Sequence, residues 1–234
     1  NYMQLAKQYL NPNWIFESQN LTESAGTRIL YHLILGHTLQ FLSFVNTLLI
    51  FRCLLIFGFS LIFSKIYKNL SIDNTQILIH LLLFIVILDQ SFFAYSWILM
   101  SVEPKGFSYL FVLLSFLFLI ERRFILSLAA LLIASYFHIL VGGFTFAYLF
   151  LTLLIFKKDY KLKINQLILA ASIYTIFIIP FIIYLKTTSL AYEATNNEIS
   201  PSWIYTYFRS PHHTALFTSL DYFVSVHFIG ILQC

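Results

Sequence analysis

The chain consists mainly of long runs of Ile, Leu and Phe separated by short polar segments. Runs of this kind predict helices, and those that approach about 20 residues are long enough to cross a bilayer. We expect helices at residues 29–42, 44–68, 75–89, 105–123, 124–140, 144–158 and 164–185, and a further one that begins near residue 215. The pattern therefore predicts an all-α fold.

The composition turns this helical pattern into a membrane prediction. Of the 234 residues, 59% are hydrophobic and 10% are charged, whereas soluble domains average about 25% charged residues. Because so little polar surface cannot cover a protein in water, lipid must cover part of it. We predict a polytopic transmembrane helix bundle with extracytoplasmic loops and interfacial helices. Residues 1–43 would form an outer loop with an interfacial helix, and residues 44–234 a bundle of about seven spans or half-spans with an outer loop at 186–214.

Both ends of the chain fall inside other features. It begins at Asn1 without a methionine, and it stops within the apolar run VSVHFIGILQC. We therefore expect a fragment of a longer protein, with its last span cut off.

Lysine and arginine gather on alternate connections between the apolar runs. The clusters are Lys65 and Lys68, Arg122 and Arg123, and Lys157, Lys158, Lys161 and Lys163. If the spans alternate in direction, all three clusters lie on one side, which the positive-inside rule assigns to the cytoplasm. The net charge of +4 is explained by these clusters, and no nucleic-acid-binding motif accompanies it, so no nucleic-acid partner is expected.

On the opposite, outer side, Glu103 is the first candidate for chemistry. It precedes Pro104, so it lies at the mouth of a span rather than within it. A carboxylate held there could act as a general base. It could equally be a ligand of a divalent metal ion, together with Asp89. The alternative is a solvated loop acid beside Lys105.

Histidines also fall on the outer side. His138 lies at the end of the run at 124–140, where it either faces a polar interior or is a helix-end histidine bonded to a backbone carbonyl. Gly142 and Gly143 follow it and permit the tight turn of a helical hairpin or close helix packing. His32 and His37, in the run at 29–42, are further candidates for the same side.

The segment YFRSPHH is the most polar string between apolar stretches. Pro211 ends any helix before His212 and His213, and adjacent side chains on an extended segment point apart, so the two histidines are not expected to chelate one metal ion. Arg209 offers a planar, permanently charged fork for phosphate oxygens, and a histidine can donate to them or carry a proton. The alternative is an interfacial segment anchored by Trp203 and the tyrosines.

Four segments carry a resemblance to a known group of proteins. They are YMQLAKQYLNPNW in the first polar stretch, EPKGFSYL at the mouth of a span, SYFHILVGG at a span end and YFRSPHH in the late outer loop. Together they resemble bacterial multi-pass membrane proteins related to the GT-C glycosyltransferases. Members of that family take a sugar from a polyprenyl-phosphate or polyprenyl-diphosphate carrier on the extracytoplasmic side. They use acidic residues of the first outer loop as base or metal ligand, and basic residues against the phosphate.

The resemblance implies a glycosyltransferase in the bacterial cytoplasmic membrane, with membrane lipid around it, a lipid-linked sugar as donor and a site that faces outward. The candidate catalytic residues, assigned from their positions in this sequence rather than from matched family positions, are Glu103 and His138. Its phosphate-binding residues would be Arg209, His212, His213 and Lys105. A divalent metal ion, with Asp89 as a ligand, is the candidate cofactor.

One departure from the family keeps other interpretations open. The first segment has no acidic residue before Glu17, so the catalytic acid could instead lie upstream of Asn1. A transporter or flippase for lipid-linked saccharides would need the same phosphate recognition without a catalytic base. An assembly subunit would need neither.

Overall fold

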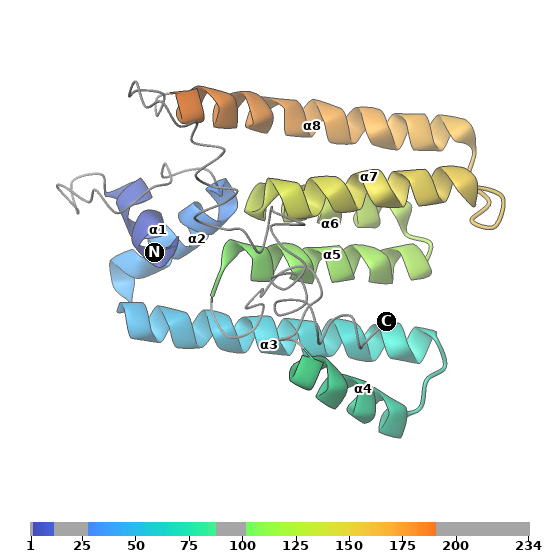
Figure 1. The fold of residues 1–234 in the computed structure, drawn as a ribbon, viewed down its shortest axis with the longest axis horizontal. Helices are drawn as coiled ribbons and strands as arrows, with labels where there is room; N and C mark the ends of the chain where they lie inside the picture. Colours follow the sequence, from blue (N-terminus) through green and yellow to red (C-terminus); the bar gives the residue numbers. More distant parts are fainter. Residues whose placement is uncertain (1, 12–27, 88–101, 191–234) are drawn as a thin grey trace, which may run out of the picture. The chain divides into compact units, whose positions relative to one another are not determined.

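The computed structural model describes residues 2–11, 28–87 and 102–190, and these parts of the chain contain helices and no strands (Figure 1). The helices are α1 (Tyr2–Leu10), α2 (Ile29–Phe41), α3 (Phe44–Asn69), α4 (Asn74–Ile87), α5 (Pro104–Ile120), α6 (Phe124–Phe137), α7 (Ile139–Ile155) and α8 (Ile164–Leu190). The predicted all-α class is confirmed for this part of the chain. The expected helices after Leu190 lie outside the described residues.

The chain divides into two compact units. One comprises Asn1–Asp73 and Ile98–Tyr192, and the other comprises Asn74–Trp97 and Glu193–Cys234. In the second unit the structure describes α4, a 14-residue apolar helix that matches the run expected at 75–89. All other described helices belong to the first unit.

Two of the described helices are long and apolar enough to cross a membrane. They are α3, with 26 residues, and the part of α8 from Ile164 to Thr187, with 24 residues. Only 17% and 22% of their most apolar 18-residue windows are buried, and both helices expose several large apolar side chains. Helices α5, α6 and α7 are equally apolar but shorter, at 17, 14 and 17 residues.

Side-chain contacts fix the directions of the long helices in the first unit. Phe51 contacts Phe107 with ring centroids 5.9 Å apart, and Gly58, further along α3, lies against Leu110, so α3 and α5 run parallel. Short connections turn the chain between α5 and α6 and between α6 and α7, and each helix packs against the next. Consecutive helices from α5 to α8 therefore alternate in direction (Figure 1).

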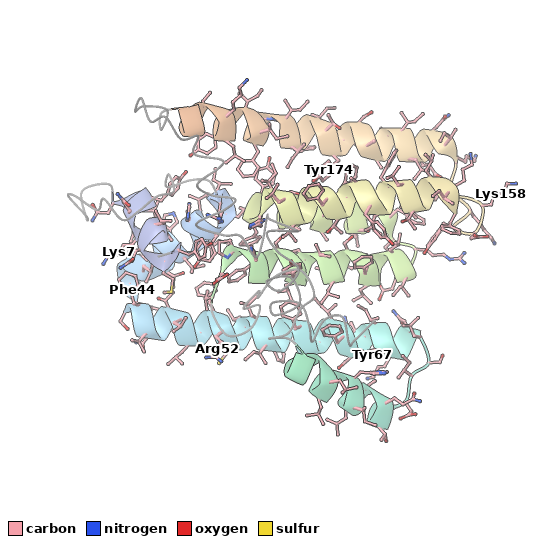
Figure 2. The ribbon with its side chains drawn as sticks, in the orientation of Figure 1. Lys7, Phe44, Arg52, Tyr67, Lys158 and Tyr174 are labelled. Atoms are coloured by element: carbon pink, nitrogen blue, oxygen red, sulfur yellow. The ribbon has the colours of Figure 1, made fainter. Side chains whose placement is uncertain are left out.

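This alternation brings the three basic clusters to one end of the first unit, as the sequence pattern predicted. The end of α3 carries Lys65 and Lys68, the α5–α6 turn carries Arg122 and Arg123, and the α7–α8 connection carries the remaining lysines, with Lys158 labelled in Figure 2. We call this the basic end. The opposite end, where α3, α5 and α7 begin, we call the Glu103 end.

Helix α2 is separate from α3 rather than continuous with it. The break falls at Leu42 and Ser43, where the Ser43 hydroxyl accepts a hydrogen bond from the Asn46 amide at 3.2 Å and caps α3. Helix α1 packs on α2, and Gly36 is required there because a Cβ atom would collide with the Ala6 carbonyl oxygen. The Lys7 ammonium lies 5.4 Å from the centre of the Phe44 ring, which ties α1 to the start of α3 (Figure 2).

The hairpin between α6 and α7 turns at a different place from the one expected. His138 is extended, with φ −154° and ψ 102°, and is the only residue between the two helices. Gly142 and Gly143 lie inside α7, so the prediction of a turn at these glycines is wrong. Close packing is the correct interpretation for Gly142, because a Cβ atom there would overlap the backbone nitrogen and Cα of Ser135.

Candidate functional site

The structure places three of the predicted site residues at the Glu103 end of the first unit. Glu103 immediately precedes α5, Lys105 lies in its first turn, and His138 lies between α6 and α7. The other four fall outside the described residues; they are Asp89, Arg209, His212 and His213.

Packing between α5 and α6 holds Glu103 and His138 at the same end. The rings of Phe107 and Phe137 stack with centroids 5.2 Å apart and planes inclined by 12°. One residue along α5, the buried Ser108 hydroxyl donates to the Ala134 carbonyl at 2.9 Å. Since Glu103 is one turn before Phe107 and His138 directly follows Phe137, the two stand on adjoining helix ends.

The Glu103 carboxylate is not used to cap its own helix. Its backbone is extended, with φ −112° and ψ 153°, and its carbonyl accepts from Gly106, but its side chain makes no capping hydrogen bond. Pro104 occupies the first helical position, where its missing N–H costs no hydrogen bond. The half-buried carboxylate is thus available to act on a bound group.

Tyr31 of α2 supports the chain just before Glu103. Its side chain is fully buried, and its hydroxyl donates to the Val102 carbonyl oxygen at 2.7 Å. Burial, and secondly the negative charge of Glu103, raise the pKa of Tyr31 above its usual range. The phenol therefore stays neutral and remains a donor at any physiological pH.

Arg28 and Tyr2 complete the surroundings of Tyr31. The Arg28 guanidinium lies 4.7 Å from the centre of the Tyr2 ring, and the Tyr2 ring lies edge-on to Tyr31 at 6.4 Å. The positive charge of Arg28 opposes the effect of Glu103 on the Tyr31 pKa, which places both charges within electrostatic range of the phenol. Among the described residues, Glu103, Arg28 and the neutral phenol of Tyr31 thus lie within electrostatic range of one another.

None of these aromatic residues was singled out by the sequence pattern. The chain has 15 Tyr and 26 Phe residues, so one tyrosine in an apolar run carries no signal of its own. Only the packing of α2 against the segment before α5 distinguishes Tyr31.

The candidate histidines take three different positions. His32 is fully buried, with its ring 5.9 Å from those of Tyr9 and Tyr31. His37 is exposed on α2. His138 caps α7, because its Nδ1 accepts a hydrogen bond from the Val141 amide at 3.4 Å. That bond occupies the Nδ1 lone pair, so neutral His138 carries its proton on Nε2 and presents a donor there.

Among the residues that the structure describes, no group of three His, Cys, Asp or Glu side chains lies close enough to hold a metal ion. Asp89, the metal ligand expected from the sequence, is outside these residues.

Replacing Tyr31 with Phe is expected to lower the free energy of unfolding by about 1–3 kcal/mol, because the buried Val102 carbonyl loses its donor. Denaturant unfolding of the full-length protein in detergent measures the change. Tyr109→Phe on α5 is the matched control, since the Tyr109 hydroxyl has no hydrogen bond to any described residue. Equal stability of the two variants would show that the Tyr31 bond contributes nothing.

Comparison with known proteins gives no match: no family model, curated protein or solved structure is similar to this chain.

Proposed function

We propose that this chain is part of a multi-pass protein of the bacterial cytoplasmic membrane, with its basic end in the cytoplasm and its Glu103 end outside. Support comes from the apolar side chains that α3 and α8 expose, since soluble proteins seldom expose contiguous apolar patches above a few hundred Å². Exposed examples on α8 are Ile168, Leu169, Ile176, Phe177, Ile182 and Ile183. The gathering of lysines and arginines at one end supports the orientation.

At the Glu103 end, we propose transfer of a sugar from a polyprenyl-phosphate carrier to an acceptor hydroxyl. The observation that carries the proposal is the half-buried Glu103 carboxylate, which leaves its own helix uncapped and lies beside the neutral, buried Tyr31. A carboxylate held in place by packed helices and free of a capping role is suited to general-base work.

The proposed reaction is a direct displacement. The acceptor oxygen forms a bond to the anomeric carbon of the sugar while the bond from that carbon to the phosphate oxygen breaks. The electron pair of the broken bond leaves with the polyprenyl phosphate, and the acceptor proton passes to Glu103. Lys105, Arg209 and one histidine of the pair His212 and His213 would stabilise the departing phosphate.

Carrier binding tests this proposal before any turnover is measured. The full-length protein, purified in lipid, would be incubated with polyprenyl phosphate and examined by native mass spectrometry. We expect the wild type to retain the carrier and the variant Arg209→Ala/His212→Ala/His213→Ala to lose it, because charge-assisted hydrogen bonds to phosphate are stronger than neutral ones.

The matched control removes three cations from the basic end instead, as Lys157→Ala/Lys158→Ala/Lys161→Ala. This variant is expected to retain the carrier. Absence of carrier from both the wild type and the control would contradict the proposed function, and equal loss from both triple variants would show that the binding depends on net charge alone.

A further inference from the structure

A cavity among the described residues lies at the basic end, remote from the Glu103 end. Its volume is about 620 Å³, within the range of small-molecule sites. Leucine, isoleucine and phenylalanine side chains of α6, α7 and α8 line most of it, including Leu128, Leu149 and Leu167. A cavity with such walls suits a hydrocarbon chain rather than a polar metabolite.

Arg122 and Arg123 are the charged residues among those that line the cavity. Arg123 is engaged locally, since its guanidinium lies 3.5 Å from the Glu121 carboxylate and 5.4 Å from the centre of the Phe118 ring. Arg122 is exposed and makes no side-chain hydrogen bond or ion pair with any described residue. Its positive charge is therefore available to an anionic group at this end of the cavity.

The backbone of Arg122 allows its side chain to be removed without strain. Arg122 ends α5 in a left-handed conformation, with φ 58°, while its amide bonds to the Leu119 carbonyl at 3.0 Å and that of Arg123 bonds to Phe118 at 2.7 Å. This is the Schellman arrangement, in which glycine is usual because a Cβ atom is disfavoured at positive φ. The chain thus carries a cation at a position where glycine would fit better.

We infer that this cavity binds an anionic phospholipid of the cytoplasmic leaflet, with one acyl chain between α6, α7 and α8 and the phosphate diester against Arg122. Arginine donates in a fork that matches phosphate oxygens, and burial of each CH₂ group in the cavity adds to the affinity. The inference rests on the proposed membrane placement but not on the proposed sugar transfer.

The test compares phosphatidylglycerol with phosphatidylcholine of the same acyl chains, each titrated into the full-length protein in detergent and followed by native mass spectrometry. We expect tighter binding of phosphatidylglycerol. Arg122→Gly should weaken phosphatidylglycerol binding about fivefold, the usual size of one basic contact to an anionic lipid. The loss should be smaller for phosphatidylcholine, because its choline cation offsets the charge of the phosphate diester that both lipids carry. Since glycine suits the left-handed backbone, this variant is expected to fold at least as well as the wild type.

Lys161→Gly is a closely matched control. Lys161 also has a positive φ, at 54°, in the same arrangement of backbone hydrogen bonds. Its replacement by glycine removes the same charge at the same end of the first unit. It is not among the residues that line the cavity, so its replacement should leave phosphatidylglycerol binding unchanged. A second variant, Ala170→Phe, fills the cavity from α8 and should weaken binding of both lipids.

Three results would overturn the inference: equal affinity for the two lipids, equal losses from Arg122→Gly and Lys161→Gly, or unchanged binding by a folded Ala170→Phe variant. A fourth result, binding of neither lipid, would overturn it too. Failure of the sugar-transfer proposal would leave these titrations unaffected, because Glu103→Gln lies at the other end and should not alter phosphatidylglycerol binding.

Discussion

Replacement of Glu103 by Gln is expected to slow sugar transfer by about 10²–10⁴-fold while leaving the retention of polyprenyl phosphate unchanged. The amide keeps the size of the side chain but cannot accept the acceptor proton, and loss of a general base typically has an effect of this size. Since the carboxylate makes no capping hydrogen bond to α5, stability should change by less than about 0.5 kcal/mol, as for ordinary surface substitutions.

The measurement is release of polyprenyl phosphate from a labelled lipid-linked sugar by the full-length protein in liposomes. Glu121→Gln is the matched control, because Glu121 belongs to the same helix, at its basic end, and pairs there with Arg123 at 3.5 Å. Full activity of Glu103→Gln would assign the base to another acid, such as Glu17 or Glu23. Carrier binding by a wild type that never turns over would instead favour a transporter or flippase.

Gly142→Ala is expected to lower the free energy of unfolding by about 1–3 kcal/mol, whereas Gly143→Ala should be neutral or raise it by up to about 1 kcal/mol. Both glycines lie inside α7, where alanine is intrinsically the better helix former. The difference arises from their neighbours. A Cβ atom on Gly142 would overlap Ser135, whereas one on Gly143 would lie 3.9 Å from the Tyr174 hydroxyl, an ordinary contact.

Ser135 cannot move aside cheaply, because it also joins α6 to α8. Its buried hydroxyl lies 2.9 Å from the Leu131 carbonyl and 2.6 Å from the hydroxyl of Tyr174 (labelled in Figure 2). The Tyr174 ring in turn stacks on Phe146 of α7, with centroids 3.7 Å apart. A displacement of Ser135 would disturb three helices at once.

Denaturant unfolding of the full-length protein in detergent provides the comparison. Because the two substitutions are adjacent and chemically identical, effects of detergent and of helix propensity cancel in their difference. Equal stability of Gly142→Ala and Gly143→Ala would show that α6 and α7 do not approach each other as closely as described here.

The sequence by itself determined the helices and the distribution of charge. Apolar runs are local features, so the run at 44–68 corresponds to α3 (Phe44–Asn69) and the run at 164–185 to α8 (Ile164–Leu190). The alternation of basic connections likewise needed only the order of the helices. The segment with Arg209, which carried much of the resemblance, lies outside the described residues, so its role stays a prediction.

Only the tertiary structure decided where the chain turns and which polar side chains serve the site. Gly142 and Gly143 are good turn residues by local preference, yet the turn falls at His138, because packing against Ser135 uses Gly142 inside a helix. The Tyr31 hydroxyl donates a hydrogen bond to the Val102 carbonyl, 71 residues away in the sequence. Arg122 lines the apolar cavity between α6, α7 and α8. In a chain so uniformly apolar, hydrophobic pattern specifies that helices form, but the partners of each helix depend on side-chain shape and hydrogen bonds between distant residues.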